Sequence, residues 1–207
     1  MITLHTLASG SSGNALLCVC GETRLLVDAG ISCRRITTAL ARLGLSLDCL
    51  SAVLVTHTHA DHIAGLQTLL KRCDVPLCAS ERTVRELRRR YAGIEARTHD
   101  LELCAPTAIG SCMVTPFPLS HDAPGACGYR IDTAGGSLGI LTDSGYVTEE
   151  AADLLPGVDL AVLEANHDVE TLCSGPYPYS LKRRILGAEG HLCNEDAARF
   201  AVTLAGA

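Results

Sequence analysis

Four potential metal ligands occur within six residues of this chain, in the segment 57–62, which reads His-Thr-His-Ala-Asp-His. Imidazole and carboxylate groups together suit Zn²⁺, Mn²⁺ or Fe²⁺. No lysine or arginine interrupts the segment, and the chain has no Cys-x-x-Cys pair, the spacing typical of structural zinc. The segment therefore predicts a metal site that does chemistry rather than one that only stabilises a fold.

The elements around this segment predict how its side chains are aimed. The apolar run 50–55 directly precedes it and reads as a buried strand. If His57 and His59 keep the strand's period of two, they point the same way and share one ion. Asp61 and His62 begin an apolar-periodic stretch that predicts a helix, and an acidic residue suits a helix N-terminus. A turn from strand to helix there aims both at a second ion.

Two more candidate ligands lie far along the chain, each after a predicted strand. His121 lies in a polar loop rich in glycine and proline, a common position for functional residues. Asp143 follows the apolar run 138–142. A carboxylate there either begins a turn or bridges two cations, and two-metal hydrolysis uses a metal spacing of ~3.5–4 Å.

The composition predicts one domain, over 1–207, in a reducing compartment. Of the residues 47% are apolar, with no Trp and two Phe, so the core must be built from aliphatic side chains and cysteine. The eleven cysteines are an odd number and no secretory signal precedes them, which favours the cytoplasm over a disulfide framework. No apolar run approaches the ~20 residues of a membrane span. The net charge of −6 argues against a generic polyanion-binding surface but allows a local basic groove.

Strands and helices are predicted along the whole chain. The strands are 2–7, 15–20, 24–28, 50–55, 75–79, 101–103, 112–117, 127–131, 138–142 and 158–163. Helices are predicted after Ser32, Asp61 and Ser80, at 148–155 and 178–187, and at 194–204 with Asn194 as its cap. Pro76 predicts that the strand 75–79 lies at a sheet edge. Hairpin-like runs together with strand–helix alternation indicate mixed sheets covered by helices.

The ligand pattern resembles that of the metallo-β-lactamase-fold superfamily. The matching positions are His57, His59, Asp61, His62, His121 and Asp143. The resemblance is closer to one branch, the WalJ (YycJ)-like exonuclease-type hydrolases, and extends from residue 2 to about residue 200. Segments similar to that branch are 7–14, 26–32, 121–123, 142–145, 163–168 and 190–196.

The resemblance implies an α/β fold, an αββα four-layer sandwich with a dinuclear metal centre at one edge of the two sheets. It implies that Asp28 orients a metal-binding imidazole. It divides the ligands between two divalent ions: His57, His59 and His121 for the first, Asp61 and His62 for the second, and Asp143 as the bridge.

The end of the chain departs from the family pattern. The family places a further histidine on the second ion, in a His-Leu-Ser segment that lies beyond Ala207. We therefore expect a C-terminally short domain. Its second site is weak, is completed by His191 or by a partner, or does not support turnover.

The expected reaction is metal-dependent hydrolysis of a phosphodiester. Zn²⁺, the expected metal, lowers the pKa of bound water to ~7 and so supplies metal-bound hydroxide at neutral pH, which Asp61 orients. An exonuclease acting on DNA is favoured. The alternatives are a hydrolase of a small cyclic phosphodiester and a truncated metal-binding domain without turnover. The sequence indicates no oligomeric state.

Other side chains are candidates for contact with the substrate. The loop 11–13 either offers backbone N–H groups to a phosphate or simply forms a turn. The basic clusters 82–90 and 182–184 suit phosphate contacts or form solvated helix faces. Tyr177 and Tyr179 precede the second cluster and either stack on bases of a single strand or pack in a core. The candidate contacts are Ser11, Ser12, Asn14, His167, Arg183, Arg184 and His191.

Overall fold

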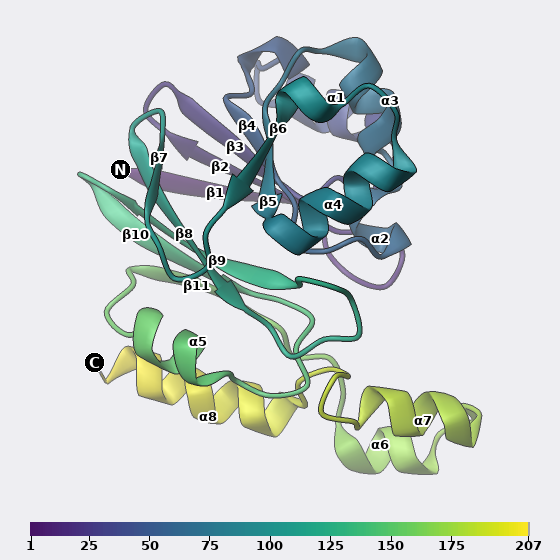
Figure 1. Ribbon diagram of the computed structural model, residues 1–207. Helices are drawn as coiled ribbons and strands as arrows, with labels where there is room; N and C mark the ends of the chain where they lie inside the picture. The colour runs from purple at the N-terminus through teal and green to yellow at the C-terminus, as the bar shows by residue number, and fades with distance from the viewer. Residues whose placement is uncertain (207) are drawn as a thin grey trace.

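The first half of the chain forms a six-stranded sheet in the computed structural model, which describes residues 1–206 (Figure 1). The strands follow one another in chain order: β1 (Ile2–Ala8), β2 (Ala15–Cys20), β3 (Thr23–Val27), β4 (Ala52–Leu54), β5 (Leu77–Ser80) and β6 (Thr98–Leu101). Pairing is antiparallel from β1 to β3 and parallel from β3 to β6. The connections carry α1 (Cys33–Arg42), α2 (Ala60–Ile63), α3 (Leu66–Arg72) and α4 (Glu81–Arg90), with 3-10 turns at Leu47–Cys49 and Glu95–Arg97.

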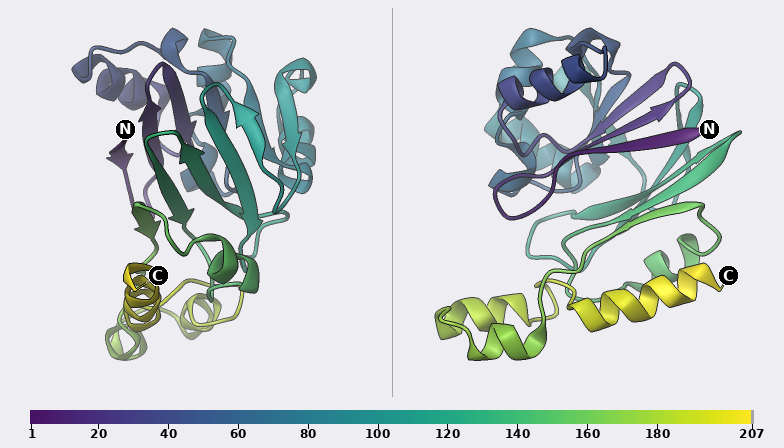
Figure 2. Two further views of the ribbon diagram at one scale, coloured as in Figure 1. Left: turned by 90° about the vertical axis from the view of Figure 1, so that its left-hand side faces the viewer. Right: turned by 180° about the vertical axis from the view of Figure 1, so that it is seen from behind.

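The second half forms a five-stranded sheet that lies face to face with the first. In spatial order its strands are β11 (Leu160–Leu163), β10 (Gly136–Leu141), β9 (Cys127–Thr133), β8 (Cys112–Pro118) and β7 (Thr107–Ile109). Helices α5 (Glu149–Leu154) and α8 (Asn194–Ala205) cover its outer face, and α6 (Val169–Ser174) and α7 (Tyr179–Ile185) lie beyond one end of α8 (Figures 1 and 2). Helices therefore cover the outside of both sheets, and the predicted αββα sandwich is confirmed.

Three apolar clusters lie between the four layers. The first joins the β1–β6 sheet to its helices through side chains such as Leu26, Ile36 and Leu69. The second fills the space between the sheets and contains Cys18, Cys20, Cys112 and Cys127 around Tyr129. The third joins the other sheet to α5 and α8 through Phe117, Leu141 and Phe200. Because a buried thiol packs as a small hydrophobe, the many cysteines build core in a chain that lacks tryptophan.

The predicted sheet edge at Pro76 and the predicted cap of the last helix are both wrong, for physical reasons. The strand at 75–79 is internal, because β5 pairs with β4 on one side and with β6 on the other. Pro76 precedes the strand, where it needs no N–H, and its carbonyl accepts from the Val53 N–H at 2.8 Å. The cap of α8 is Cys193, whose thiol accepts from the Asp196 N–H.

The helix predicted after Asp61 is two helices, α2 and α3, separated at Gly65. A Cβ at position 65 would collide with the carbonyl oxygen of Ile31, so the chain can pass there only as glycine. Among residues 1–206, no helix combines the length and apolar character needed to cross a bilayer.

Candidate metal centre

The candidate ligands converge at one end of the sandwich, where strands of both sheets end. His57 and His59 lie in the loop between β4 and α2, and His62 lies within α2. His121 follows β8, and Asp143 follows β10. The ring centroid of His57 is 4.0 Å from that of His62 and 4.9 Å from that of His121. The fold thus brings together side chains from distant parts of the chain.

Three sets of possible ligand atoms form here, and within each set the atoms lie within 4.8 Å of one another. The sets are His57, His59 and His121; His57, His62 and Asp143; and His121, Asp143 and His191. Asp143 belongs to two of them. Asp61, a predicted ligand, belongs to none of the three sets, although its Oδ2 lies 3.6 Å from His62 Nε2. The sets overlap, because His57, His121 and Asp143 each belong to two of them.

The environment of His57 fits a bound cation. Thr56 Oγ1 donates to Asp28 Oδ2 at 2.8 Å, so it can only accept from His57 Nδ1, 3.0 Å away. This assigns the proton of the neutral imidazole to Nδ1 and leaves a lone pair on Nε2. Burial, and then the proximity of His62, lower the pKa of His57 to about 2, so the ring is neutral. Nε2 is buried without a hydrogen-bond partner among the described residues, and a metal ion would satisfy it.

The other two imidazoles of this set present lone pairs to the same point. His121 Nδ1 lies 3.0 Å from the Gly190 carbonyl oxygen and must donate to it, which leaves the lone pair on Nε2. His59 Nε2 lies 3.3 Å from Asp122 Oδ1, an arrangement that favours a proton on Nε2 and a lone pair on Nδ1. His59 Nδ1 and His121 Nε2 face each other at 3.1 Å. Two facing lone pairs repel unless a cation or proton lies between them.

The His62 imidazole lies between two carboxylates, those of Asp28 and Asp143. His62 Nδ1 donates to Asp28 Oδ2 at 2.7 Å, and His62 Nε2 lies 3.0 Å from Asp143 Oδ2. Burial alone would lower the pKa of His62, but the charges of Asp28 and Asp143 raise it to about 10. Asp28 also accepts from the Thr56 N–H at 2.8 Å, and its φ of 61° is left-handed. This fixed carboxylate orients His62, and the two carboxylates together favour a positive charge on its imidazole.

The loop between β1 and β2 contacts the centre through Asn14 rather than through its serines. Asn14 Nδ2 lies 3.1 Å from His62 Nε2 and 3.4 Å from Asp61 Oδ2, and the Asn14 N–H donates to the Asp61 carbonyl. Ser11 and Ser12 are exposed at the tip of the loop. Asn14 therefore helps to position two candidate ligands, while the serines face solvent.

Glu164 is a residue of the centre that the sequence analysis missed. Its Oε1 lies 2.7 Å from His191 Nδ1, and its Oε2 accepts from the N–H groups of Ser144 and Leu192. Burial would lower the pKa of His191, but the neighbouring Glu164 raises it. A signal was present: β11 runs parallel to β10, so the acids that follow the two strands, Asp143 and Glu164, meet at one edge.

Asp122 is a second missed residue, and it changes how the basic cluster at 182–184 is interpreted. Arg184 donates from Nε and Nη2 to the Asp122 carboxylate at 2.6 and 3.0 Å, and this hydrogen bonding lowers the pKa of Asp122. Lys182 donates to the carbonyls of Cys173 and Gly175. Arg183 is exposed. Only Arg183 of the cluster is thus directed at solvent.

His167, another candidate contact, joins none of the three ligand sets. Its carbonyl accepts from the Asn194 N–H at 2.8 Å, and its backbone forms a bridge with Cys193. Both ring nitrogens are buried and make no hydrogen bond within residues 1–206. Burial lowers the pKa of the ring, which favours its neutral form.

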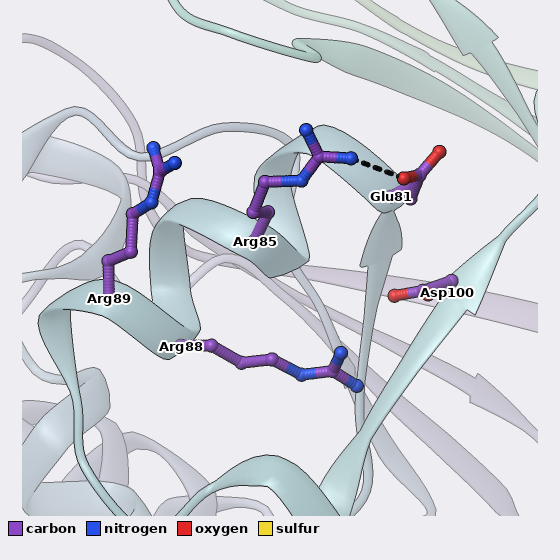
Figure 3. A pocket seen from close by; sticks show the side chains of 5 residues that line it. All are labelled: Glu81, Arg85, Arg88, Arg89 and Asp100. Atoms are coloured by element: carbon purple, nitrogen blue, oxygen red, sulfur yellow. Dashed lines mark hydrogen bonds and ion pairs between the residues drawn. The ribbon is translucent and has the colours of Figure 1, made fainter.

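The basic cluster on α4 lines a surface hollow of mixed charge. The hollow has a volume of about 300 Å³ and is lined by Glu81, Arg85, Arg88, Arg89 and Asp100. Arg85 pairs with Glu81, and Arg88 extends toward β6, where it donates to Thr98 (Figure 3). Arg89 pairs with Glu86 at 2.6 Å. These contacts neutralise much of the positive charge that the sequence suggested.

The two ends of α4 form hydrogen bonds with the two loops that carry His57, His59 and His121. At the start of the helix, Ser80 Oγ donates to the Gly125 carbonyl at 2.6 Å, close to the loop of His121. At its end, Arg90 donates to the carbonyl of Thr58 at 3.0 Å, between His57 and His59. The helix therefore fixes the spacing of these loops.

Comparison with known proteins identifies the family of the chain. Residues 23–207 match the beta-lactamase superfamily domain. The chain therefore belongs to the metallo-β-lactamase superfamily, as predicted, and is a hydrolase of that superfamily. The structure of a diphosphatase from the PhnP family has a TM-score of 0.72 and 22% identity, covering 99% of this chain and 84% of its own, and shows the same fold.

Within the superfamily, the chain is similar over most of its length to curated exodeoxyribonucleases. Exodeoxyribonuclease YycJ of Bacillus anthracis is 39% identical over 193 residues, which are 93% of this chain and 73% of that protein. Exodeoxyribonuclease WalJ of Streptococcus pneumoniae serotype 2 is 39% identical over 203 residues, which are 97% of this chain and 76% of that protein. The branch predicted from the sequence is confirmed.

Proposed function

We propose that this protein is a DNA exonuclease that hydrolyses phosphodiester bonds with two divalent ions, zinc first among the candidates. The observation that carries the proposal is the set of three imidazole lone pairs, from His57, His59 and His121, that face one point beside the shared carboxylate of Asp143. The similarity to two exodeoxyribonucleases over more than nine-tenths of the chain supports DNA as the substrate.

The first ion is assigned to the three imidazoles and the second to Asp61 and His62, with Asp143 shared. Divalent ions in these positions would neutralise charge on the phosphoryl oxygens and lower the pKa of a water molecule. Asp28 holds His62 with its Nε2 toward the second position. We assign Asp61, whose Oδ2 lies 3.6 Å from His62 Nε2, the role of orienting the attacking water.

The pair Glu164–His191 supplies a proton to the leaving oxygen. Hydrolysis of a DNA phosphodiester leaves an alkoxide that needs a proton, and a positioned acid contributes about 10²–10⁴-fold in rate. Glu164 orients the His191 ring through Nδ1, and the ring lies 5.1 Å from that of His121. We therefore assign His191 the role of proton donor to a phosphodiester bound at the metal centre, a role that its contact with Glu164 supports.

The function is tested by metal analysis together with digestion of linear DNA labelled at its 5′ or its 3′ end. We expect up to two divalent ions per chain, release of mononucleotides from one end, and loss of both ions and activity with a strong chelator. Covalently closed circular DNA and small cyclic phosphodiesters are the control substrates and should resist. Rapid hydrolysis of a cyclic phosphodiester with intact linear DNA would replace the exonuclease proposal with the cyclic one.

Glu164→Gln should lower the turnover of DNA by about 10²-fold or more, because the amide no longer holds a protonated His191. A p-nitrophenyl phosphodiester should be much less affected, since its leaving group needs no proton. The two rates are compared at unchanged metal content. Glu170→Gln, at an exposed position of α6, is the matched control. Equal losses on both substrates would assign Glu164 a structural role.

We also propose that the protein works in the cytoplasm. Cys18, Cys20 and Cys112 are free thiols in the buried layer between the sheets. Burial raises the pKa of Cys18 and Cys20, which keeps both protonated and unreactive. A core built from thiols in this way suits a reducing compartment.

A further inference from the structure

Two aromatic side chains in the segment leading into α7 lie outside the core. Tyr177 is 54% exposed and Tyr179 is 77% exposed, whereas Tyr129 in the layer between the sheets is 0% exposed. Aromatic residues make up only 3% of this chain. Aromatic rings this exposed gain less from packing than a core ring such as Tyr129, and their free surface is available to a ligand.

An exposed arginine lies on the same face of α7 as Tyr179. Tyr179 begins α7 and Arg183 is four residues later, so the two side chains lie on one face of the helix. Arg183 makes no hydrogen bond or ion pair with the part of the chain that the structure describes. An aromatic ring next to a free guanidinium is the combination that binds a base and its phosphate on a single strand.

The same helix is fixed to the candidate metal centre. Arg184 donates two hydrogen bonds to Asp122, and Asp122 Oδ1 lies 3.3 Å from His59 Nε2. Lys182 ties α7 to the end of α6 through the carbonyls of Cys173 and Gly175. At a rise of 1.5 Å per residue, Tyr179 lies only about 7–8 Å along the helix from Arg184.

Both ribbon views place the hairpin of α6 and α7 at the end of the sandwich where α2 lies (Figures 1 and 2). The hairpin that carries the exposed side chains therefore lies at the same end of the molecule as the helix that carries His62. The hollow on α4 has no comparable character, because Glu81 and Asp100 line it together with its arginines.

We propose that the α6–α7 hairpin is a platform for single-stranded DNA. Bases stack on Tyr177 and Tyr179, Arg183 contacts the phosphate backbone, and Arg184 holds the platform against the metal centre. Single strands are the partner because the faces of their bases are available for stacking, whereas those inside a duplex are covered. This proposal rests on the proposed exonuclease function. It specifies the substrate of the exonuclease as a DNA end that is single-stranded or frayed.

The test measures binding of a fluorescent oligothymidylate with hydrolysis-resistant phosphorothioate linkages by fluorescence anisotropy. Tyr177→Ala and Tyr179→Ala should each weaken binding roughly tenfold, since one stacked base is lost, while Tyr→Phe at either position should retain it. Arg183→Ala should reduce the slope of log K against log salt concentration by about 0.7. Arg34→Ala, at an exposed position of α1, is the matched control. All variants should hydrolyse a small chromogenic phosphodiester at the wild-type rate.

The outcomes separate the platform from the exonuclease function. Unchanged oligothymidylate binding in the alanine variants, or no binding by the wild-type protein, would overturn the platform. If linear DNA is still digested in that case, the exonuclease function stands alone. If the wild-type protein binds oligothymidylate through the tyrosines but digests no DNA, the platform stands and the exonuclease function fails.

Discussion

His57→Ala is expected to abolish the first metal site and to lower phosphodiesterase activity by about 10³-fold or more. The variant removes the buried Nε2 lone pair that is unpartnered among the described residues. It also removes a member of two of the three ligand sets. Loss of an ion that stabilises charge by several kcal/mol corresponds to a rate effect of this size. Metal content by mass spectrometry and hydrolysis of labelled DNA are the two measurements.

The controls for this variant separate metal loss from unfolding. His59→Ala removes a half-exposed ligand of the same set and should give a similar loss of metal with less effect on stability. His99→Ala changes an exposed histidine of β6 and should leave metal content and activity unchanged. An unchanged metal count in both His57→Ala and His59→Ala would remove the basis of the assignment.

The fold was predictable where a local pattern determines the structure. Apolar runs predicted most of the strands. Ser32 and Ser80 predicted the starts of two helices, because their side chains accept hydrogen bonds from N–H groups of the first turn. Short or context-dependent elements were missed. The three-residue strand β7 has no pattern of its own, and it exists because it pairs with β8.

In the candidate site, residues close together in the sequence could be predicted, whereas residues brought together only by the fold could not. The candidate ligands His57, His59 and His62 are close in sequence, so spacing alone predicts that they lie near one another, as they do in the structure. Asp122 and Glu164 act through partners 62 and 27 residues away, at Arg184 and His191, which only the fold brings near.

The basic cluster at 182–184 illustrates a further limit of sequence analysis. Successive residues of a helix point about 100° apart, so three adjacent cations do not form one patch. In the structure Lys182 binds carbonyls, Arg183 faces solvent and Arg184 pairs with Asp122. A double substitution of Arg183 and Arg184 would therefore disturb the metal centre as well as any DNA contact, and Arg183 must be tested alone.

Asp143→Asn is expected to lower the occupancy of both ions and to reduce activity by about 10²–10³-fold. Asp143 is the residue shared by the sets around His62 and His191, with its Oδ2 3.0 Å from His62 Nε2 and its Oδ1 3.4 Å from His191 Nδ1. Burial would raise the pKa of Asp143. The hydrogen bond with His62 and the charge of His62 instead lower this pKa well below its usual range. The side chain is therefore a carboxylate, and the amide removes its charge while keeping its shape. Because metal affinity depends on ligand charge, both ions lose a contribution.

Titration of each variant with Zn²⁺ and a mild chelator distinguishes a bridging carboxylate from a ligand of one ion. Asp100→Asn, which changes an exposed carboxylate outside the ligand sets, is the matched control and should bind both ions normally. If Asp143→Asn loses one ion and keeps the other at wild-type affinity, Asp143 serves a single site. His191→Ala then becomes decisive, because His191 shares a ligand set with Asp143 and His121. Weaker binding of the second ion in that variant would make His191 a ligand, whereas unchanged binding with slower DNA turnover fits the proton-donating role that its contact with Glu164 supports.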